Sequence, residues 1–331
     1  MIRFVEVARF DDLGGAVLVC AAGFEERAVA FARRAASGGV RFGRFVVIEY
    51  LPHHVKNRLE ELLELGSLLA PGSVERVVFD RRFPGECEDL TQEALAKLSG
   101  GGRVVLDLSG MSRFLICLLV ARLIRANVPL GLVYTEPDDY RPTKDEADSA
   151  FATIADSSDM MFLTTGLYGF AAVDDLTTAT MQGYPELLVA SPTFEPRLMR
   201  ALLNEMSPAK VVLMEGIPAE RYKWRRDSVR RLNVAWFETA IVVSVPTDGI
   251  EEATKAMWAI FRKYKYEFRI IVAPAASKLV AVGLAAAIAQ GVEVEVVYPT
   301  PSSFSDPYSD GARESRFWMS ESVEDTGVAG T

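Results

Sequence analysis

The stretch Val104–Leu123, VVLDLSGMSRFLICLLVARL, decides the fold of this chain. Its first residues, Val104–Leu108, form a short apolar run typical of a buried strand, and Ser109–Ser112 are small and polar enough to turn the chain. From Arg113 onward, the apolar residues predict a buried helix. Because the first backbone N–H groups of a helix have no partner within it, this unit should attract anions, and Arg113 adds a cation at the same place.

The length and charge of the chain limit what it can do. A length of 331 residues suits two domains, and half of the residues are apolar, which is enough for a core in each domain. The net charge of −9 argues against broad nucleic-acid binding, which needs a basic face. It leaves room for a small anionic ligand in a local basic pocket.

Cysteine and histidine usage indicates a reducing compartment without a metal site. The three cysteines show no CxxC spacing, and Cys20 and Cys117 lie in apolar runs, so we expect buried free thiols in a cytoplasmic protein. The adjacent His53 and His54 would point to opposite faces of a strand, so we expect no metal there. The first ten residues lack the apolar core of a signal peptide, and arginines interrupt the apolar region 114–134, so we expect no membrane span.

Strand-like and helix-like segments alternate, which predicts an α/β fold with mostly parallel sheets flanked by helices. The expected strands are 2–7, 16–21, 45–50, 74–79, 104–108, 130–135, 186–191, 210–214, one within 236–245, 269–273 and 292–298. The expected helices are 27–36, 55–65, 90–98, the one that begins at 113, 194–206, 220–232, 251–264 and 278–289.

These segments divide into two tandem Rossmann-like lobes, 1–137 and 186–320. The connection 138–185 is polar at first, with a single helical turn, and then holds either a β-hairpin or a loop over a site. Residues 321–331 read as a flexible tail.

The two halves repeat each other in order, which indicates an internal duplication. VLVCAAGFEERAVAFARR aligns with LLVASPTFEPRLMRALLN. The stretch Val104–Leu123 aligns with RIIVAPAASKLVAVGLAAAI. The aligned pairs are Phe24 with Phe194, Glu25 with Glu195, Arg27 with Arg197, Ser112 with Ser277, Arg113 with Lys278, and Tyr134 with Tyr298. Phe-Glu-x-Arg and Ser-Arg/Lys both fall at strand-to-helix turns, at the sheet edge where open α/β sheets bind ligands.

The repeated turns supply the candidate ligand-binding residues. They are Gly23, Phe24, Glu25, Arg27, Ser109, Gly110, Ser112 and Arg113 in the first copy, and Thr193, Phe194, Arg197, Ser277 and Lys278 in the second. Structural roles remain open for each pair. Glu25 and Arg27 could form an ion pair, Ser112 and Ser277 could simply cap their helices, and the two tyrosines could wall a base or end core strands.

The strand, the Ser/Gly turn and the basic residue before a long apolar helix resemble the CRISPR-associated Rossmann fold (CARF) domains, and two such units in one chain resemble the related SAVED domains. Those families bind cyclic oligonucleotides that serve as second messengers in antiviral defence. The resemblance implies ligand contacts from Ser109, Gly110, Ser112, Arg113, Ser277 and Lys278, with 22–24 and 192–194 lining the same pocket. The Gly-Gly-Thr core of the turn is absent from both copies, and no effector domain is recognised, so a separate effector protein is implied.

Three functions are compatible with these residues. The first is a nucleotide sensor that holds a small anionic ligand between the lobes. The second is an enzyme acting on a nucleotide or phosphate ester, such as a metal-independent ring-opening phosphodiesterase, with Glu25 and Glu195 as the leading catalytic candidates and Asp107 and Glu136 as further acid/base groups. No Walker A or GxGxxG motif occurs, and we expect no cofactor. The third is a scaffold that docks a partner on the basic helix 220–232, although such a charge run is more often a solvated surface.

Overall fold

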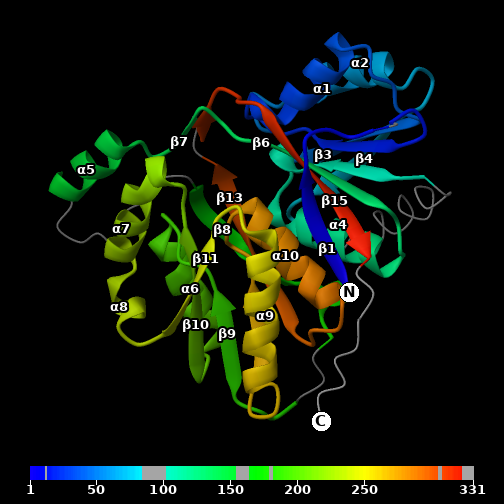
Figure 1. The fold of residues 1–331 in the computed structure, drawn as a ribbon. Helices are drawn as coiled ribbons and strands as arrows, with labels where there is room; N and C mark the ends of the chain where they lie inside the picture. The colour runs from blue at the N-terminus through cyan, green and yellow to red at the C-terminus, as the bar shows by residue number, and fades with distance from the viewer. Residues whose placement is uncertain (12, 84–101, 154–163, 179–181, 305–307, 323–331) are drawn as a thin grey trace.

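The computed structural model describes residues 1–11, 13–83, 102–153, 164–178, 182–304 and 308–322. Within these ranges the chain folds into two Rossmann-like lobes, each a mostly parallel sheet flanked by helices (Figure 1). The fold class expected from the alternation of segments is confirmed. The helix expected at 90–98 lies outside the described residues.

The first lobe has five parallel strands in the order β6-β5-β2-β3-β4. The strands are β2 (Val17–Ala21), β3 (Arg44–Leu51), β4 (Val74–Asp80), β5 (Val104–Asp107) and β6 (Leu130–Thr135). Its described helices are α1 (Arg27–Ser37), α2 (Leu59–Leu69) and α4 (Arg113–Arg125). All residues of β2, β5 and β6 are buried, as their apolar runs predict for strands covered on both faces.

The second lobe repeats this strand order as β13-β12-β9-β10-β11. The strands are β9 (Glu186–Ala190), β10 (Lys210–Ile217), β11 (Ile241–Pro246), β12 (Arg269–Ala273) and β13 (Glu295–Phe304). The helices are α6 (Pro196–Met206), α7 (Lys223–Leu232), α8 (Val234–Phe237), α9 (Ile250–Tyr264) and α10 (Lys278–Ala289). In both lobes the first strand of the repeat lies at the centre of the five, beside the fourth, so the duplication read from the sequence extends to the topology.

Each lobe lends one strand to the other. β8 (Thr164–Ala172) follows the first lobe in sequence but pairs antiparallel with β13 of the second. β15 (Ser315–Ser322) follows the second lobe but pairs antiparallel with β6 of the first, and β1 (Ile2–Val7) pairs with its other edge. Two short strands, β7 (Asp139–Tyr140) and β14 (Ser309–Asp310), pair with each other. β7 belongs to the segment that leads from the first lobe to β8, and β14 to the segment that leads from the second lobe to β15.

This exchange changes two expectations for the connecting segments. The described strand in the region expected to hold a hairpin is β8, whose partner is the distant β13 rather than a neighbouring run. Residues 315–320, expected in the second lobe, and residues 321–322, expected in a flexible tail, instead form β15 of the first sheet. The acidic segment expected to form one helical turn contains the ten-residue helix α5 (Lys144–Thr153). Sequence pattern does not specify which strand edge a segment reaches, because that depends on tertiary packing.

The two lobes share one apolar core through the equivalent helices α4 and α10. Buried side chains of both helices belong to the same cluster, including Leu118 and Val282. The thiol of Cys117 contacts the carbonyl oxygen of Ala281 at 3.6 Å. Cys20 and Cys117 are both buried and free, as expected. Among the described residues, no helix is both long and apolar enough to cross a membrane.

Candidate functional site

A cavity of about 380 Å³ lies between the lobes. Four loops contribute to its wall: 22–24 after β2, 110–113 after β5, 191–194 after β9 and 275–278 after β12. In each lobe these loops follow the two neighbouring strands from which the chain proceeds in opposite directions across the sheet, the position at which open α/β sheets bind ligands. The duplication therefore brings two such positions together in one cavity.

The loops of the first lobe approach each other closely because of two glycines. A Cβ atom on Gly110 would lie 2.3 Å from the carbonyl oxygen of Ala21, and one on Gly23 would lie 3.3 Å from the Cα atom of Gly110. Both glycines line the cavity. The backbone of the turn between β5 and α4 is thereby held against the loop that follows β2.

The first residues of α4 and α10, Arg113 and Lys278, each reach across to the opposite lobe. The Nε atom of Arg113 donates a hydrogen bond to the carbonyl oxygen of Ala276, and the Nζ atom of Lys278 donates one to the carbonyl oxygen of Ser109. Both side chains also line the cavity. Within the described ranges, neither forms an ion pair with a carboxylate.

The serines that precede these cations act as helix caps. The hydroxyl of Ser112 accepts a hydrogen bond from the backbone N–H of Leu115 (3.3 Å), and that of Ser277 accepts one from Val280 (3.2 Å). The hydroxyl of Ser277 also donates to the carbonyl oxygen of Thr247. Both serines line the cavity, but their hydroxyls are already engaged, so the capping role that the sequence left open is the one observed.

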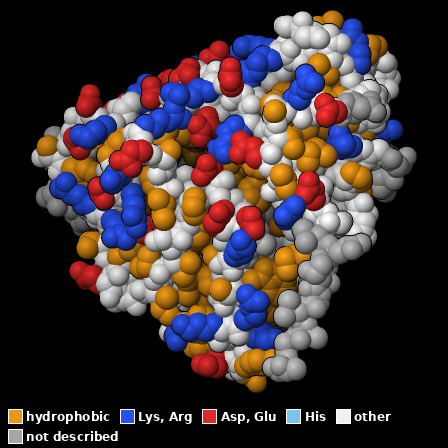
Figure 2. All heavy atoms as spheres, in the orientation of Figure 1, with side chains coloured by type: hydrophobic (Ala, Val, Ile, Leu, Met, Phe, Trp, Pro, Cys, Tyr) orange, Lys and Arg blue, Asp and Glu red, His pale blue; other side chains and the backbone are white. Residues whose placement is uncertain are grey.

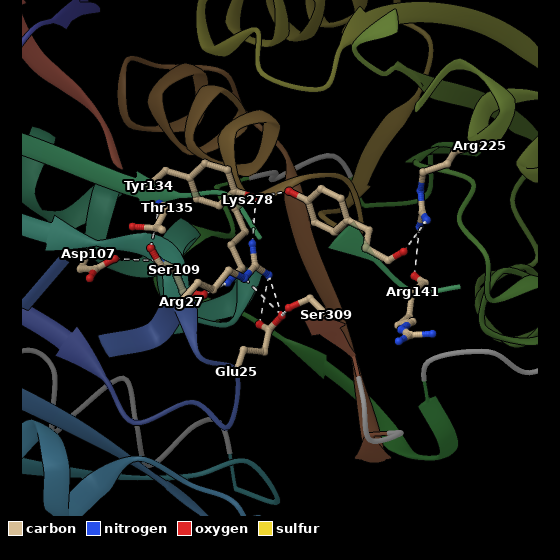
Figure 3. A network of polar contacts seen from close by, with 11 residues as sticks. Glu25, Arg27, Asp107, Ser109, Tyr134, Thr135, Arg141, Arg225, Lys278 and Ser309 are labelled. Carbon is tan, nitrogen blue, oxygen red and sulfur yellow. Dashed lines mark hydrogen bonds and ion pairs between the residues drawn. The ribbon is translucent and has the colours of Figure 1, made fainter. Parts of the chain in front are cut away.

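Glu25 and Arg27 form the centre of a polar network (Figure 3). The carboxylate of Glu25 accepts from Nε and Nη2 of Arg27 at distances of 3.0–3.2 Å, and also accepts from the hydroxyl of Ser309 in β14. Nη1 of Arg27 donates to the hydroxyl of Tyr134 (3.0 Å), which lies 2.7 Å from the hydroxyl of Tyr140 in β7. The ion pair left open by the sequence is therefore present, and it faces the cavity.

Burial and charge oppose each other at this network. Burial alone would raise the pKa of Glu25, but the charges of Arg27 and Lys278 and the hydrogen bonds from Ser309 and Arg27 outweigh it, so the pKa is lowered. For Lys278, burial and the neighbouring charges of Arg27 and Arg113 lower the pKa well below its usual range, against the attraction of Glu25 and Asp107. The cavity wall thus holds cations that repel one another.

Asp107 and Ser109 lie at the start of the turn that connects β5 to α4. Asp107 ends β5 and accepts a hydrogen bond from the backbone N–H of Ser109 (3.0 Å), while its Oδ2 atom has no hydrogen-bond partner among the residues that the structure describes. Burial raises the pKa of Asp107 to about 6, against the opposing hydrogen bonds of Ser109 and the charge of Lys278. The hydroxyl of Ser109 accepts from the backbone N–H of Thr135 (2.9 Å). Ser109 is fully buried and supports the turn from below, rather than lining the cavity as expected.

The second copy of Phe-Glu-x-Arg does not reproduce the first. Thr193 and Phe194 line the cavity, whereas Glu195 and Arg197 do not, and Arg197 is exposed. Helix α6 begins at Pro196, one position earlier in the repeat than α1, which begins at Arg27. Arg27 is buried beside the cavity, whereas Arg197 at the equivalent place in the repeat is exposed to solvent. Two expected residues, Glu195 as a catalytic candidate and Arg197 as a ligand contact, are thereby moved out of the cavity wall.

Arg225 of helix α7 takes up a place in the second lobe that the sequence analysis missed. It donates to the backbone carbonyls of Tyr140, Arg141 and Pro142, at 2.8–3.4 Å, and its guanidinium lies 4.4 Å from the ring centre of Phe194. Burial lowers the pKa of Arg225 to about 10, with partial compensation from nearby tyrosines. Arg225 lines the cavity and forms no ion pair with a carboxylate among the described residues.

Other arginines of the basic segment 220–232 have internal partners. Arg226 and Arg230 both bind the buried carboxylate of Glu215, and Arg221 pairs with Glu136 at 2.6 Å. In Figure 2, basic and acidic side chains are intermingled across the upper part of the face that is shown. These arginines remain partly exposed to solvent, as expected for a solvated charge run, but their charges are paired with carboxylates of this chain, so they do not form an unpaired basic docking surface.

Aromatic side chains wall the cavity beside both copies of the repeated phenylalanine. Phe24 is stacked on His54, with ring centres 4.2 Å apart, and Tyr308 meets it edge-on. Phe194 lies beneath Arg225 in the other lobe. Tyr134 and Tyr298 line the cavity as well. Flat apolar rings on both sides of a cationic centre suit a ligand that combines planar groups with negative charge.

The histidines have found separate partners. His53 binds the carboxylate of Glu49, and His54 forms the stacked pair with Phe24. No group of three or more potential metal ligands occurs among the residues that the structure describes.

Comparisons with known proteins identify no family for this chain. No family model matches this chain, and no curated protein sequence matches it significantly. Among solved structures, it is similar to the cytoplasmic domain of a prokaryotic cation chloride cotransporter, with a TM-score of 0.26 and 8% identity over 87% of this chain and 96% of that one. A putative universal stress protein from Pseudomonas aeruginosa gives a TM-score of 0.24 and 11% identity over 86% and 93% of the chains. A universal stress protein from Archaeoglobus fulgidus gives 0.23 and 12% over 86% and 96%.

Proposed function

We propose that this chain binds a small, phosphate-bearing ligand of the nucleotide type in the cavity between its lobes. The observation that carries the proposal is the set of three cations in the cavity wall, Arg113, Lys278 and Arg225, none of which pairs with a carboxylate of the described residues. Burying a cation that forms no ion pair costs free energy, and for Lys278 the attraction of Glu25 and Asp107 offsets that cost only in part. An anionic ligand that binds among them would recover that cost.

The helix positions of two of these cations strengthen the proposal. Arg113 and Lys278 stand at the first residues of α4 and α10, where the helix dipole is positive and disfavours a cation. Stability alone would select an acidic residue at these positions. A positive charge added to a positive helix end is expected where an anion is bound.

The size and lining of the cavity indicate the class of ligand. Its volume of about 380 Å³ lies toward the lower end of the roughly 300–1,000 Å³ typical of small-molecule sites. Aromatic rings on both lobes would face planar bases, while the cations would hold phosphates. A mononucleotide or a dinucleotide fits this description better than a long oligonucleotide does.

The more specific form of the proposal is a sensor for a cyclic oligonucleotide second messenger in antiviral defence. It rests on the resemblance of the two strand–turn–helix units to CARF and SAVED domains. The placement of both turns on one cavity agrees with it, because a cyclic ligand built from repeated nucleotides has repeated contacts to offer. A separate effector protein would then respond to the bound state.

Mass spectrometry of small molecules that copurify with the full chain tests the proposal directly. We expect denaturation to release a phosphate-bearing nucleotide in near-stoichiometric amount. If the purified protein is empty, we expect it to bind such a nucleotide when the nucleotide is added. Isothermal titration calorimetry with ATP, a cyclic dinucleotide and a cyclic oligoadenylate then ranks the ligand classes. Absence of binding by every nucleotide at millimolar concentration would refute the function.

Turnover of the ligand is the second candidate, since the carboxylate of Glu25 lies in the cavity beside two cations. Its lowered pKa makes it a weak base, so we expect little or no conversion. Incubation with cyclic oligoadenylates followed by chromatography measures this. Rapid conversion that disappears in Glu25→Gln would establish the enzyme instead.

A further inference from the structure

Glu25 occupies the position on Arg27 that an anion would take. Its carboxylate meets the guanidinium in a forked arrangement, with Oε1 3.2 Å from Nε and Oε2 3.0 Å from Nη2. Arg27 itself is buried; its other hydrogen bond among the described residues goes to the hydroxyl of Tyr134, and its guanidinium also lies 5.7 Å from the ring centre of Tyr140. Forked pairing of this kind is also how arginine binds phosphate. The equivalent Glu195 does not line the cavity, so only the first lobe places this glutamate in the wall.

The same carboxylate is tied to the small sheet formed by β7 and β14. The hydroxyl of Ser309 in β14 donates to Glu25. On the other strand, the hydroxyl of Tyr140 in β7 bonds to that of Tyr134, which in turn accepts from Arg27. Both strands of the β7–β14 pair are therefore connected to Arg27, one through Glu25 and the other through Tyr134 (Figure 3).

The β7–β14 pair joins the two segments that connect the lobes. β7 precedes β8, which joins the second sheet, and β14 precedes β15, which joins the first. Tyr140 and Tyr308, at and beside this pair, line the cavity. The chain thus leads from β7 to β8, at the edge of the second sheet, and from β14 to β15, which lies between β1 and β6 in the first sheet.

We propose that Glu25 is an internal competitor of the ligand: a phosphate of the ligand displaces its carboxylate from Arg27, which frees Ser309 and loosens the β7–β14 pair. This inference rests on the proposed function, since it assumes an anionic ligand in the same cavity. The phosphate forms the forked pair with Arg27 in place of Glu25. Glu25 is then repelled by the like charge of the phosphate and loses its position beside Ser309. No covalent bond is made or broken.

Calorimetry with ATP as the probe tests the competition. Glu25→Gln keeps the size of the side chain but removes its charge, so we expect it to bind ATP at least about fivefold more tightly than the natural chain, the lower limit of ordinary coupling between sites. Glu6→Gln is the matched control, because Glu6 also pairs with an arginine, Arg316 at 2.8 Å, but lies outside the cavity. Its affinity for ATP should be unchanged.

Hydrogen exchange of residues 308–313 tests the release of the β7–β14 pair. ATP should speed exchange there in the natural chain, whereas Glu25→Gln should exchange fast before any ATP is added. Ser309→Ala keeps the charge of Glu25 and removes only the link to β14, so it should also exchange fast without ATP. This variant keeps the test decisive if Glu25→Gln fails to fold.

The outcomes separate the two proposals. If the natural chain binds ATP but Glu25→Gln binds equally or more weakly, Glu25 is a ligand contact or a bystander, and the competitor is refuted while the proposed function stands. Unchanged exchange at 308–313 on ATP binding refutes the release. If neither chain binds ATP or any nucleotide of the panel, the proposed function fails and the competitor falls with it.

Discussion

Arg113 and Lys278 occupy the same position in the two copies of the repeat, and each donates a hydrogen bond to a backbone carbonyl of the opposite lobe. The two cations therefore link the lobes and face the cavity at once. A ligand bound between them would contact both lobes at their junction. This dual position makes them the first residues to test.

Replacing both cations should weaken ligand binding strongly. Each charge-assisted contact contributes about 1.5–3 kcal/mol, and about 1.4 kcal/mol corresponds to tenfold in affinity. We therefore expect Arg113→Ala combined with Lys278→Ala to weaken binding of the identified ligand at least about a hundredfold by calorimetry. Circular dichroism should show an intact fold. Unchanged affinity would mean that the two cations serve only the junction of the lobes.

Arg225 should matter for both the ligand and the segment around β7. Arg225→Ala removes the donors to three backbone carbonyls of residues 140–142, so exchange of amide hydrogens at 138–143 should become faster. Loss of the cation should weaken nucleotide binding by about tenfold or more. Lys223→Ala on the same helix is the control, since Lys223 is exposed and outside the cavity wall. Equal behaviour of the two variants would contradict the role given to Arg225.

Asp107 should make the chain less stable as the pH rises. Its pKa is raised in the folded state to about 6, from an ordinary value of 3.8. The folded state therefore favours the protonated form, and the associated stability is fully present below about pH 4 and is lost as the pH passes through about 6. The loss is on the order of 3 kcal/mol at most.

Asp107→Asn removes this titration. In urea unfolding between pH 4 and pH 8, the natural chain should lose stability relative to the variant over the range from about 4 to about 6. The other titrating groups are common to both proteins and cancel in the difference. A difference that stays constant with pH would show that Asp107 is not protonated in the folded state.

Gly110 should tolerate no side chain. Its Cβ would lie 2.3 Å from the backbone oxygen of Ala21, so Gly110→Ala must displace the organising turn. We expect a loss of about 1–3 kcal/mol in the free energy of unfolding, as for other overpacked sites. Gly15→Ala is the control, because nothing lies within 4 Å of its added Cβ. Similar melting temperatures for both variants would contradict the close packing of the turn.

Local patterns carried the prediction of the strands and of the organising helix. The strand 130–135 and the helix 278–289 have the predicted bounds in the structure, because an uninterrupted apolar run and a definite cap leave little choice of boundary. The repeat predicted that the turns at 112 and 277 occupy equivalent places, and they do, each capping its helix. These features depend on neighbours within a few residues.

The features that the sequence did not reveal depend on distant partners. Arg197 matches Arg27 in the alignment, yet it is exposed and outside the cavity wall, whereas Arg27 is buried and part of that wall. Arg225 looked like one charge in a basic run, and only the arrival of residues 140–142 beside it makes it a part of the wall. Nothing in the composition of 315–322 indicates that its partner is β6.

The exchange of strands has a consequence for how this protein is made in a cell. Thr135 of β6 and Ser315 of β15 are paired across 180 residues of sequence. A ribosome that has synthesised the whole first lobe has not yet produced the strand that covers β6. Until β15 emerges, that edge is an unpaired template for other chains. The sheet of the first lobe therefore stays incomplete, with an exposed edge, until residues 315–322 have been synthesised.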